Sequence, residues 1–276
     1  MLKNELKRAF TNKGMLLSIL LGQGINIYYI YSVMSQFWEK SKNIAQIEER
    51  AGIEIYMHIS RNTPFDIWII GHMGQALVLF MYFLPVIATL PYAASYASEK
   101  KSGYVKNVIY REGRVRYRIN KMVASFIAGG TAVASVLIVN LMWCFTCMPM
   151  KMPVASSNAP LAGARTMLGV MYYDHPFLYC GVYIIMAFIF AGTISLVSIL
   201  VSELTTNIFT VTLFPFLVLM VLNTLLIEEK GYYLPMQFLK ASNSGYKLYL
   251  VPLIAVIIIP LSVLLFVVCG KRKDIL

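Results

Sequence analysis

Six long apolar stretches constrain this chain more than any other feature of its sequence. They cover residues 14–37, 71–97, 122–148, 178–201, 208–227 and 248–270. A helix rises about 1.5 Å per residue, so roughly 20 apolar residues cross a hydrocarbon core of about 30 Å. Each stretch is therefore long enough to span a bilayer. The sequence predicts an all-α integral membrane protein with six transmembrane helices and a single membrane domain over residues 1–276.

The distribution of basic residues predicts the orientation of these spans. Fifteen of the 24 Lys and Arg residues lie in the N-terminal segment, the 98–121 connection and the C-terminal tail, and nine lie in the longer connections on the other side. Basic residues in short loops favour the cytoplasmic side. We expect both termini to be cytoplasmic. The net charge of +11 then reflects topology and contact with membrane lipids, and gives no reason to expect a nucleic-acid partner.

Sequence patterns for catalysis are missing from the chain. It has no G-x-x-x-x-G-K-[ST] loop for ATP, and His58, His72 and His175 form no H-E-x-x-H pair. Within the six stretches His72 is the one ionisable side chain besides Tyr and Cys, which disfavours an intramembrane enzyme or an ion-coupled carrier. We expect no catalytic residue, no metal site and no cofactor bound by this chain.

The stretch SEKKSGYVKNVIYREGRVRYR, residues 98–118, carries nine charged groups between two apolar runs. Gly103 and Gly113 bracket the nine residues YVKNVIYRE. Their apolar members fall at helical spacing and are Tyr104, Val105, Val108 and Ile109. Gly113 suits a helix C-terminus because glycine adopts the left-handed conformation at little cost. The pattern predicts an amphipathic helix of about 14 Å across the cytoplasmic ends of the second and third spans.

Two interpretations of this segment remain open. A basic loop that only fixes topology explains the charges. A helix whose apolar stripe docks into a groove of another protein explains the bracketing glycines as well. The second interpretation describes how a membrane channel could be driven by a motor on a separate polypeptide.

At these positions the sequence resembles the ABC-2 type permeases, the membrane subunits of bacterial ABC exporters. The matching features are an acid followed closely by glycine, a short helix, basic residues and a lysine that opens the third span. Here they are Glu99, Gly103, Tyr104–Glu112, Arg114 and Lys121. The six-span layout with cytoplasmic termini agrees with the family. The Arg-Glu-Gly turn at 111–113 differs, because many relatives carry a proline-containing turn there.

The resemblance implies that the short helix is a coupling helix, seated in a cleft of a cytoplasmic ATPase that holds ATP and Mg. The residues concerned are Glu99, Gly103, Tyr104, Val105, Val108, Ile109, Arg111 and Glu112. It also implies a second permease, a bacterial plasma-membrane location and alternating access. Similarity to small bacitracin- and lantibiotic-resistance permeases implies export of an amphipathic peptide or lipid-like cargo.

The N-terminal segment MLKNELKRAF is also predicted to form an amphipathic helix. Leu2, Leu6, Ala9 and Phe10 share one helical face, with Lys3, Lys7 and Arg8 on the other. The resemblance implies that it is a connecting helix in the membrane interface. A plain basic leader to the first span fits the sequence equally well.

Amide side chains inside the spans are candidates for lining a transport pathway. They are Gln23, Asn26, Gln75, Asn140 and Asn223. Buried amides in lipid usually bond across helices, so a structural role is favoured for each. Gly22 and Gly24 should allow close helix approach, and Pro85, Pro91 and Pro215 should bend their spans.

Two function classes remain at this stage. One is the permease of an ABC exporter, and the other is a non-transporting membrane sensor or assembly protein whose basic loop docks a partner. The sequence leaves open the cargo, the direction of transport, and whether the second permease is a copy of this chain or a different one. Cys144, Cys147 and Cys180 are expected to pack as apolar residues, with a Cys147–Cys180 disulfide as the alternative.

Overall fold

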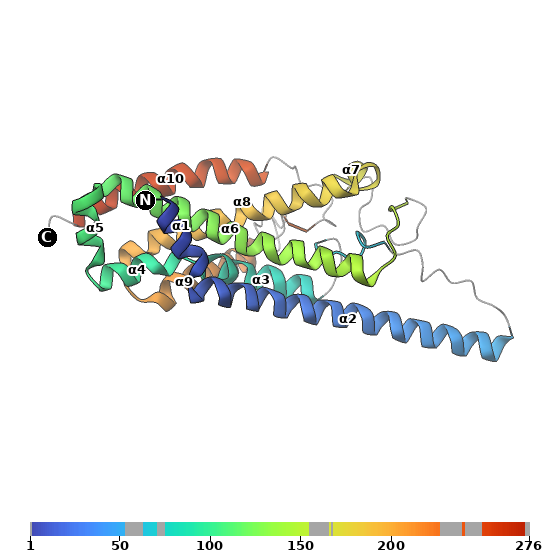
Figure 1. The fold of residues 1–276 in the computed structure, drawn as a ribbon. Coiled ribbons are helices and arrows are strands. Elements are labelled where there is room, and N and C mark those ends of the chain that lie inside the picture. Colours follow the sequence, from blue (N-terminus) through green and yellow to red (C-terminus); the bar gives the residue numbers. More distant parts are fainter. Residues whose placement is uncertain are drawn as a thin grey trace.

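The computed structural model describes residues 2–52, 63–70, 75–154, 166, 168–226, 239–240 and 250–273, and its regular elements are helices (Figure 1). They are α1 (Leu2–Thr11), α2 (Lys13–Ala51), α3 (Gln75–Thr89), α4 (Ala93–Lys101), α5 (Tyr104–Glu112), α6 (Arg114–Cys147), α7 (Gly169–Asp174), α8 (Pro176–Leu204), α9 (Ile208–Leu226) and α10 (Leu250–Lys273). The predicted all-helical class is confirmed.

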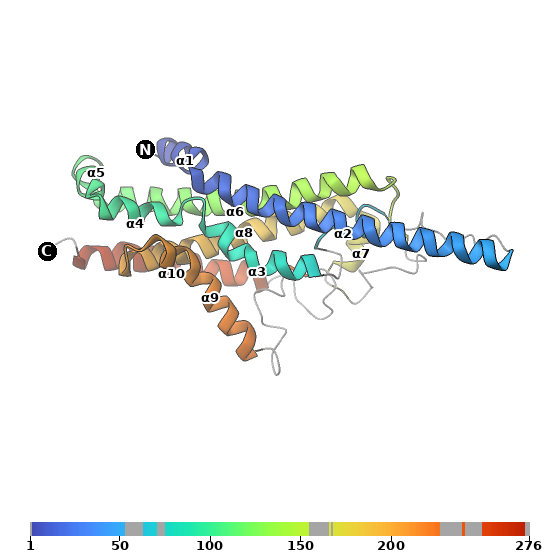
Figure 2. The same ribbon diagram turned by 90° about the horizontal axis from the view of Figure 1, so that it is seen from below.

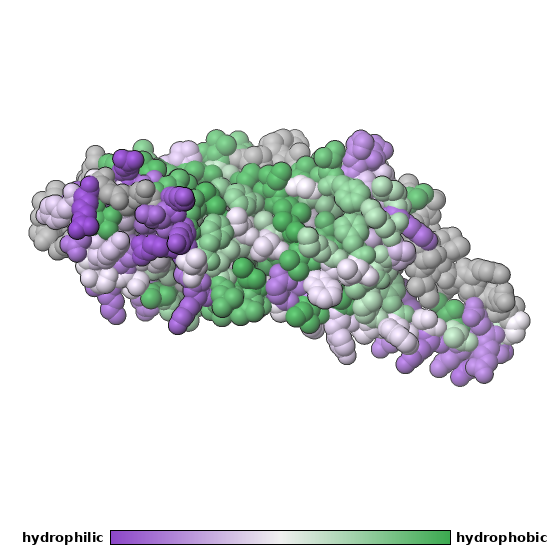
Figure 3. All heavy atoms as spheres, viewed as in Figure 1, coloured by the Kyte–Doolittle hydropathy of each residue, from purple (hydrophilic) through white to green (hydrophobic). Residues whose placement is uncertain are grey.

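The long helices run along one axis of an elongated bundle (Figures 1 and 2). The short helix α5 lies at one end of the bundle, together with α1, and the far end of α2 protrudes at the other. Figure 3 shows apolar side chains around the middle and hydrophilic ones gathered toward the two ends. This distribution fits a bundle with its middle in a bilayer and its ends in water.

Among the described residues, five helices are long and apolar enough to cross a membrane. They are Lys13–Ala51, Gln75–Lys101, Arg114–Cys147, Pro176–Leu204 and Ile208–Leu225. The second of these combines α3 and α4. The sixth predicted span falls on α10, whose described apolar part, Ala255–Phe266, is shorter. The chain is thus a multi-pass membrane protein by its helices, and the count of six stays a prediction.

Helices α6 and α8 form the centre of the bundle through small residues. A Cβ added at Gly129 would come within 2.8 Å of the Ser195 side chain and 2.5 Å of the Ala88 carbonyl. One turn away, the hydroxyls of Ser125 and Ser195 lie 2.6 Å apart. Gly22 of α2 likewise meets Val136 of α6 too closely for any side chain, whereas Gly24 faces open space. Of the two predicted close approaches, the one at Gly22 is present.

The second predicted span, 71–97, is interrupted between Thr89 and Ala93, where Pro91 lies. Proline lacks an N–H and cannot continue a helix ladder. The side chain of Asn12 accepts from the backbone N–H of Met15 at 2.7 Å and donates to the Pro91 carbonyl. Asn12 therefore caps α2 and ties the start of that helix to the break.

Helix α2 is longer than its predicted span, 14–37. Its 39 residues extend about 58 Å and end at Gly52, which adopts the left-handed conformation with φ 65°. The apolar run stops near Phe37, but residues 38–51 are rich in good helix formers such as Glu, Lys, Gln and Ala. Residues 38–51 therefore continue α2 beyond the apolar run.

Residues 63–70 form a buried non-helical segment against α2 and α6. Tyr29 donates to the carbonyl of Ile67, and the indole of Trp68 donates to the carbonyl of Leu137 at 3.3 Å. The Asp66 carboxylate accepts from Thr63 and from Tyr172 of α7. Burial raises the pKa of Tyr172, so its phenol keeps the proton that it donates. These bonds satisfy irregular backbone that lipid would not tolerate if it were exposed.

Candidate functional site

Helix α5 occupies the nine residues that the sequence predicts to be helical, between α4 and α6. Gly103 before it has φ 73° and Gly113 after it has φ 81°. Residues with a Cβ rarely adopt positive φ. The two glycines therefore let the chain reverse twice within a few residues, so α5 crosses the end of the bundle.

The predicted apolar stripe of α5 faces its own bundle. Val105 is 7% exposed, and Val108 and Ile109 are half-buried against the same apolar cluster. The buried members of this cluster are Ala93, Tyr96, Val105, Tyr117, Met122, Leu196, Ile199 and Phe266. This differs from the expectation that the stripe as a whole contacts a partner. Most of it holds α5 onto α4, α6, α8 and α10.

The outward surface of α5 is aromatic and basic. Tyr110 is 90% exposed and Tyr104 is 45% exposed. A hollow of about 530 Å³ is lined by Tyr104, Asn107, Val108, Tyr110 and Arg111. The guanidinium of Arg8, from α1, lies 5.4 Å from the centre of the Tyr104 ring. We call the residues that line this hollow the α5 surface.

Directly behind α5 lies the Lys121 cluster, made of Glu5, Arg8, Tyr92, Glu99, Tyr117 and Lys121. The fully buried Lys121 ammonium is 2.7 Å from a Glu99 oxygen and 3.2 Å from a Glu5 oxygen. Arg8 reaches the same Glu99 carboxylate at 2.7 Å. Glu5 and Glu99 thus pair with the buried Lys121 and with the partly exposed Arg8, so each buried charge in the cluster is compensated, as its desolvation requires.

Two tyrosines complete the hydrogen bonds of the Lys121 cluster. Tyr117 donates to Glu99 at 2.5 Å, and Tyr92 donates to Glu5. The cluster joins α1, α4 and α6 to the start of the α5 turn. The structure therefore brings together Glu99 and Lys121, two of the ionisable positions that carry the resemblance.

A second cluster, the Glu203 cluster, contains Tyr96, Lys100, Arg118 and Glu203. The Glu203 carboxylate lies 3.3 Å from both Arg118 and Lys100, and Tyr96 donates to it at 2.8 Å. Arg118 also donates to the carbonyl of Phe266 in α10. This cluster extends the polar connection from α4 and α6 to α8 and α10.

The sequence-based reasoning missed Glu5, Arg118 and Glu203 as members of this site. A usable signal was present, because Arg118 and Lys121 lie three residues apart on one face of a helix that begins at Gly113. Glu5 shares its face of α1 with Leu2 and Ala9 rather than with Lys3 and Lys7. Their partners come from more than eighty residues away, and only packing reveals them.

The predicted connecting-helix residues lie along α1. Leu6 packs with Ala9, Tyr92, Ala124 and Ala128, and Leu2 is half-buried. Phe10 is 43% exposed, on the outer side of the helix. The face that α1 presents to the bundle is therefore centred on Glu5 and Ala9.

The predicted amide set divides into two groups. Asn26 donates to Gln23 at 3.0 Å and to the Val136 carbonyl at 2.9 Å, and it accepts from Asn140 at 3.1 Å. Asn140 in turn accepts from the backbone N–H of Ile69 at 3.1 Å. These amides join α2 and α6 to the buried segment 63–70. Gln75 is exposed and Asn223 is half-exposed, and the described contacts bring neither into this group.

The described part of the chain contains neither a metal-ligand cluster nor a disulfide. No group of three or more His, Cys, Asp or Glu there is close enough to hold a metal ion. Cys144, Cys147 and Cys180 are free thiols, so the Cys147–Cys180 disulfide is not formed. The site therefore consists of two buried groups of paired charges, the Lys121 cluster and the Glu203 cluster, behind the exposed α5 surface.

Comparison with known proteins gives no relative for this arrangement. No family model, curated protein or solved structure matches the chain.

Proposed function

We propose that this chain is the membrane subunit of an ATP-driven exporter of the ABC-2 type, in which α5 connects the membrane helices to a separate ATPase. The observation that carries the proposal is α5 itself: a nine-residue helix fixed across the end of the bundle, with Tyr110 almost fully exposed. A rigidly mounted short helix with a large exposed aromatic side chain is well suited to an aromatic-accepting cleft.

The two clusters behind α5 support a mechanical role. A displacement of α5 acts on α4 and α6 through short turns, and on α1 and α8 through Glu99, Lys121 and Glu203. Buried ion pairs resist separation because an unpaired charge is costly out of water. Pressure from a partner on the α5 surface would thus move several spanning helices together.

The partners follow from the same proposal. ATP and Mg belong to the cytoplasmic ATPase, which closes on ATP binding. A second permease, either another copy or a different chain, completes the pathway in the bacterial plasma membrane. The cargo class is an amphipathic peptide or lipid-like molecule, moved by alternating access. Asn26 contacts Gln23 within α2 and Asn140 across to α6, which supports a structural role for these amides within that pathway.

Co-purification with candidate cytoplasmic ATPases tests the proposal. Tyr110→Asp should abolish retention of the ATPase, because it removes an exposed ring without disturbing the buried stripe. Val170→Asp is the matched control, since Val170 is 68% exposed on α7 at the opposite end of the molecule, and it should retain the ATPase fully.

Two results would oppose the proposal. If no cytoplasmic ATPase is retained by the unmodified chain, the coupling role is lost. If an ATPase or another partner is retained but its rate is unaffected by amphipathic peptides or lipids in vesicles, a sensor or assembly protein becomes the better description.

A further inference from the structure

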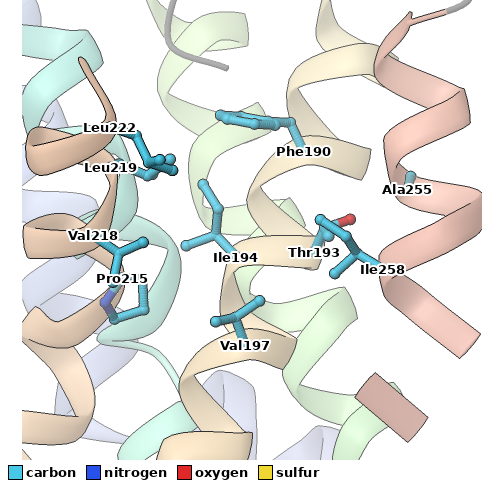
Figure 4. A pocket seen from close by; sticks show the side chains of 10 residues that line it. All are labelled: Phe190, Thr193, Ile194, Val197, Pro215, Val218, Leu219, Leu222, Ala255 and Ile258. Carbon is cyan, nitrogen blue, oxygen red and sulfur yellow. The ribbon is translucent and has the colours of Figure 1, made fainter. Parts of the chain in front are cut away.

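A pocket lies between three helices in the middle of the bundle, away from the α5 surface (Figure 4). Its volume is about 190 Å³. The residues from α8 are Phe190, Thr193, Ile194 and Val197, those from α9 are Pro215, Val218, Leu219 and Leu222, and those from α10 are Ala255 and Ile258.

The chemistry of the pocket excludes a polar ligand. Of the ten described residues that line it, Thr193 has the one polar side chain, and its hydroxyl donates to the Ile189 carbonyl of its own helix at 2.8 Å. None of these ten side chains carries a charge. Apolar cavities of about 150 Å³ stay dry and bind hydrocarbon, so a pocket of this size and lining is suited to an alkyl chain.

The first half of α9 is bonded to the bundle through its backbone carbonyls. Pro215 has no N–H to bond the Val211 carbonyl four residues earlier. Ser198 of α8 donates to that carbonyl instead, and Thr89 of α3 donates to the Thr212 carbonyl at 3.0 Å. Figure 2 shows α9 diverging from the bundle, which leaves a wedge between α8, α9 and α10.

The wedge opens toward the surface that faces lipid. Val218 and Leu222, on its α9 side, are 38% and 37% exposed. Their neighbours Leu217, Val221 and Leu225 are more than half exposed, as expected of a lipid-facing helix.

The depth of the pocket lies within the hydrocarbon core of a bilayer. Along α8 it extends from Val197 to Phe190, which lie seven and fourteen residues before the helix end at Leu204. At about 1.5 Å per residue these positions are about 10 Å and 21 Å below that end. In a core of about 30 Å, this interval is filled by acyl chains.

We propose that this pocket binds one acyl chain of a membrane phospholipid. A volume of about 190 Å³ is too small for a helix, which is about 10 Å across with its side chains. Acyl chains surround its open side at the right depth. The site is independent of the α5 surface and of any ATPase.

Native mass spectrometry of the detergent-purified chain, after addition of phosphatidylglycerol, tests the proposal. The unmodified chain should retain one phospholipid. Ala255→Phe should lower retention about tenfold or more, because the new ring fills the pocket and leaves no room for a chain. Val256→Phe is the matched control: Val256 is adjacent but 68% exposed, and the variant should retain lipid normally.

A crosslinking experiment tests the same pocket without relying on the Ala255→Phe variant, which could lose lipid because it misfolds. Benzoylphenylalanine placed at Leu222 of the otherwise unmodified chain should form a phospholipid adduct in detergent. Absence of retained lipid, equal retention by Ala255→Phe, or a crosslink to a second copy of the chain instead of lipid would each overturn the proposal. None of these results depends on transport activity.

Discussion

At the scale of single residues, a few buried charged side chains carry the largest desolvation penalty in the fold. Lys121 is fully buried, and its ammonium group is held by carboxylates from two other helices. Replacing a buried ion pair by apolar residues is often neutral, whereas removing one partner leaves a charge without compensation. Glu5, Glu99 and Lys121 are therefore interdependent, and their energetic contribution is a property of the set.

Lys121→Met should lower the free energy of unfolding by about 3–5 kcal/mol, because it removes the buried cation that Glu5 and Glu99 share and leaves them the partly exposed Arg8. Lys101→Met is the control, since Lys101 is exposed on α4 and its loss should cost less than about 0.5 kcal/mol. Denaturant unfolding in detergent measures both. Equal stability of the two variants would mean that the cluster contributes nothing to the fold.

At the scale of elements, α5 depends on its two flanking glycines. Gly103 ends the α4 turn with φ 73° and ψ 0°, a left-handed conformation that costs other residues roughly 1–2 kcal/mol. The apolar stripe can reach the cluster around Tyr96 and Phe266 only if both turns are made. The positive φ angles of Gly103 and Gly113 thus determine whether the α5 surface faces outward.

Gly103→Ala should destabilise the chain by about 1 kcal/mol through strain at positive φ. Gly24→Ala is a matched change within α2, where an added Cβ meets nothing within 4 Å, and it should be neutral or stabilising by up to about 1 kcal/mol. Comparing melting temperatures in one detergent separates the two effects. A larger loss for Gly24→Ala would contradict the assignment of strain to the α5 turn.

At the scale of the whole molecule, the bundle has two different ends. One carries α1, α5 and the buried ion pairs, and the other carries α7, the buried segment 63–70 and the protruding part of α2 (Figure 1). The excess of basic residues lies at the first end, which favours the cytoplasm for it.

Cysteine labelling in intact cells tests this orientation. In a background without native cysteines, Val170→Cys should react with a membrane-impermeant maleimide from outside, and Tyr110→Cys should react only after permeabilisation. Both positions are well exposed, at 68% and 90%, so access depends on side alone. The reverse pattern would invert the topology and remove the α5 surface from the reach of a cytoplasmic ATPase.

The sequence was sufficient for features that depend on neighbours along the chain. Apolar run length indicated the spanning helices, and the glycine spacing predicted α5. Pro91, predicted to bend the second span, lies where α3 and α4 separate. It was insufficient where contacts join distant segments. Glu203 reads as an ordinary acid in a turn until α8 is packed beside Arg118, and residues 63–70 read as a connection until Asn140 and Tyr29 bond their backbone. The orientation of the α5 apolar stripe toward its own bundle could likewise be seen only in the packed structure.

The burial of three glutamates leaves an excess of positive charge on the surface at the α5 end of the bundle. With Glu5, Glu99 and Glu203 buried, the ionised groups left on that end are mostly cations, including Lys3, Lys7, Lys101, Arg111 and Arg116. Their field attracts acidic surfaces, but it decays over about 8 Å at physiological ionic strength. Encounters at this end should therefore be fast in dilute buffer and slow markedly as salt is added, whichever acidic surface arrives.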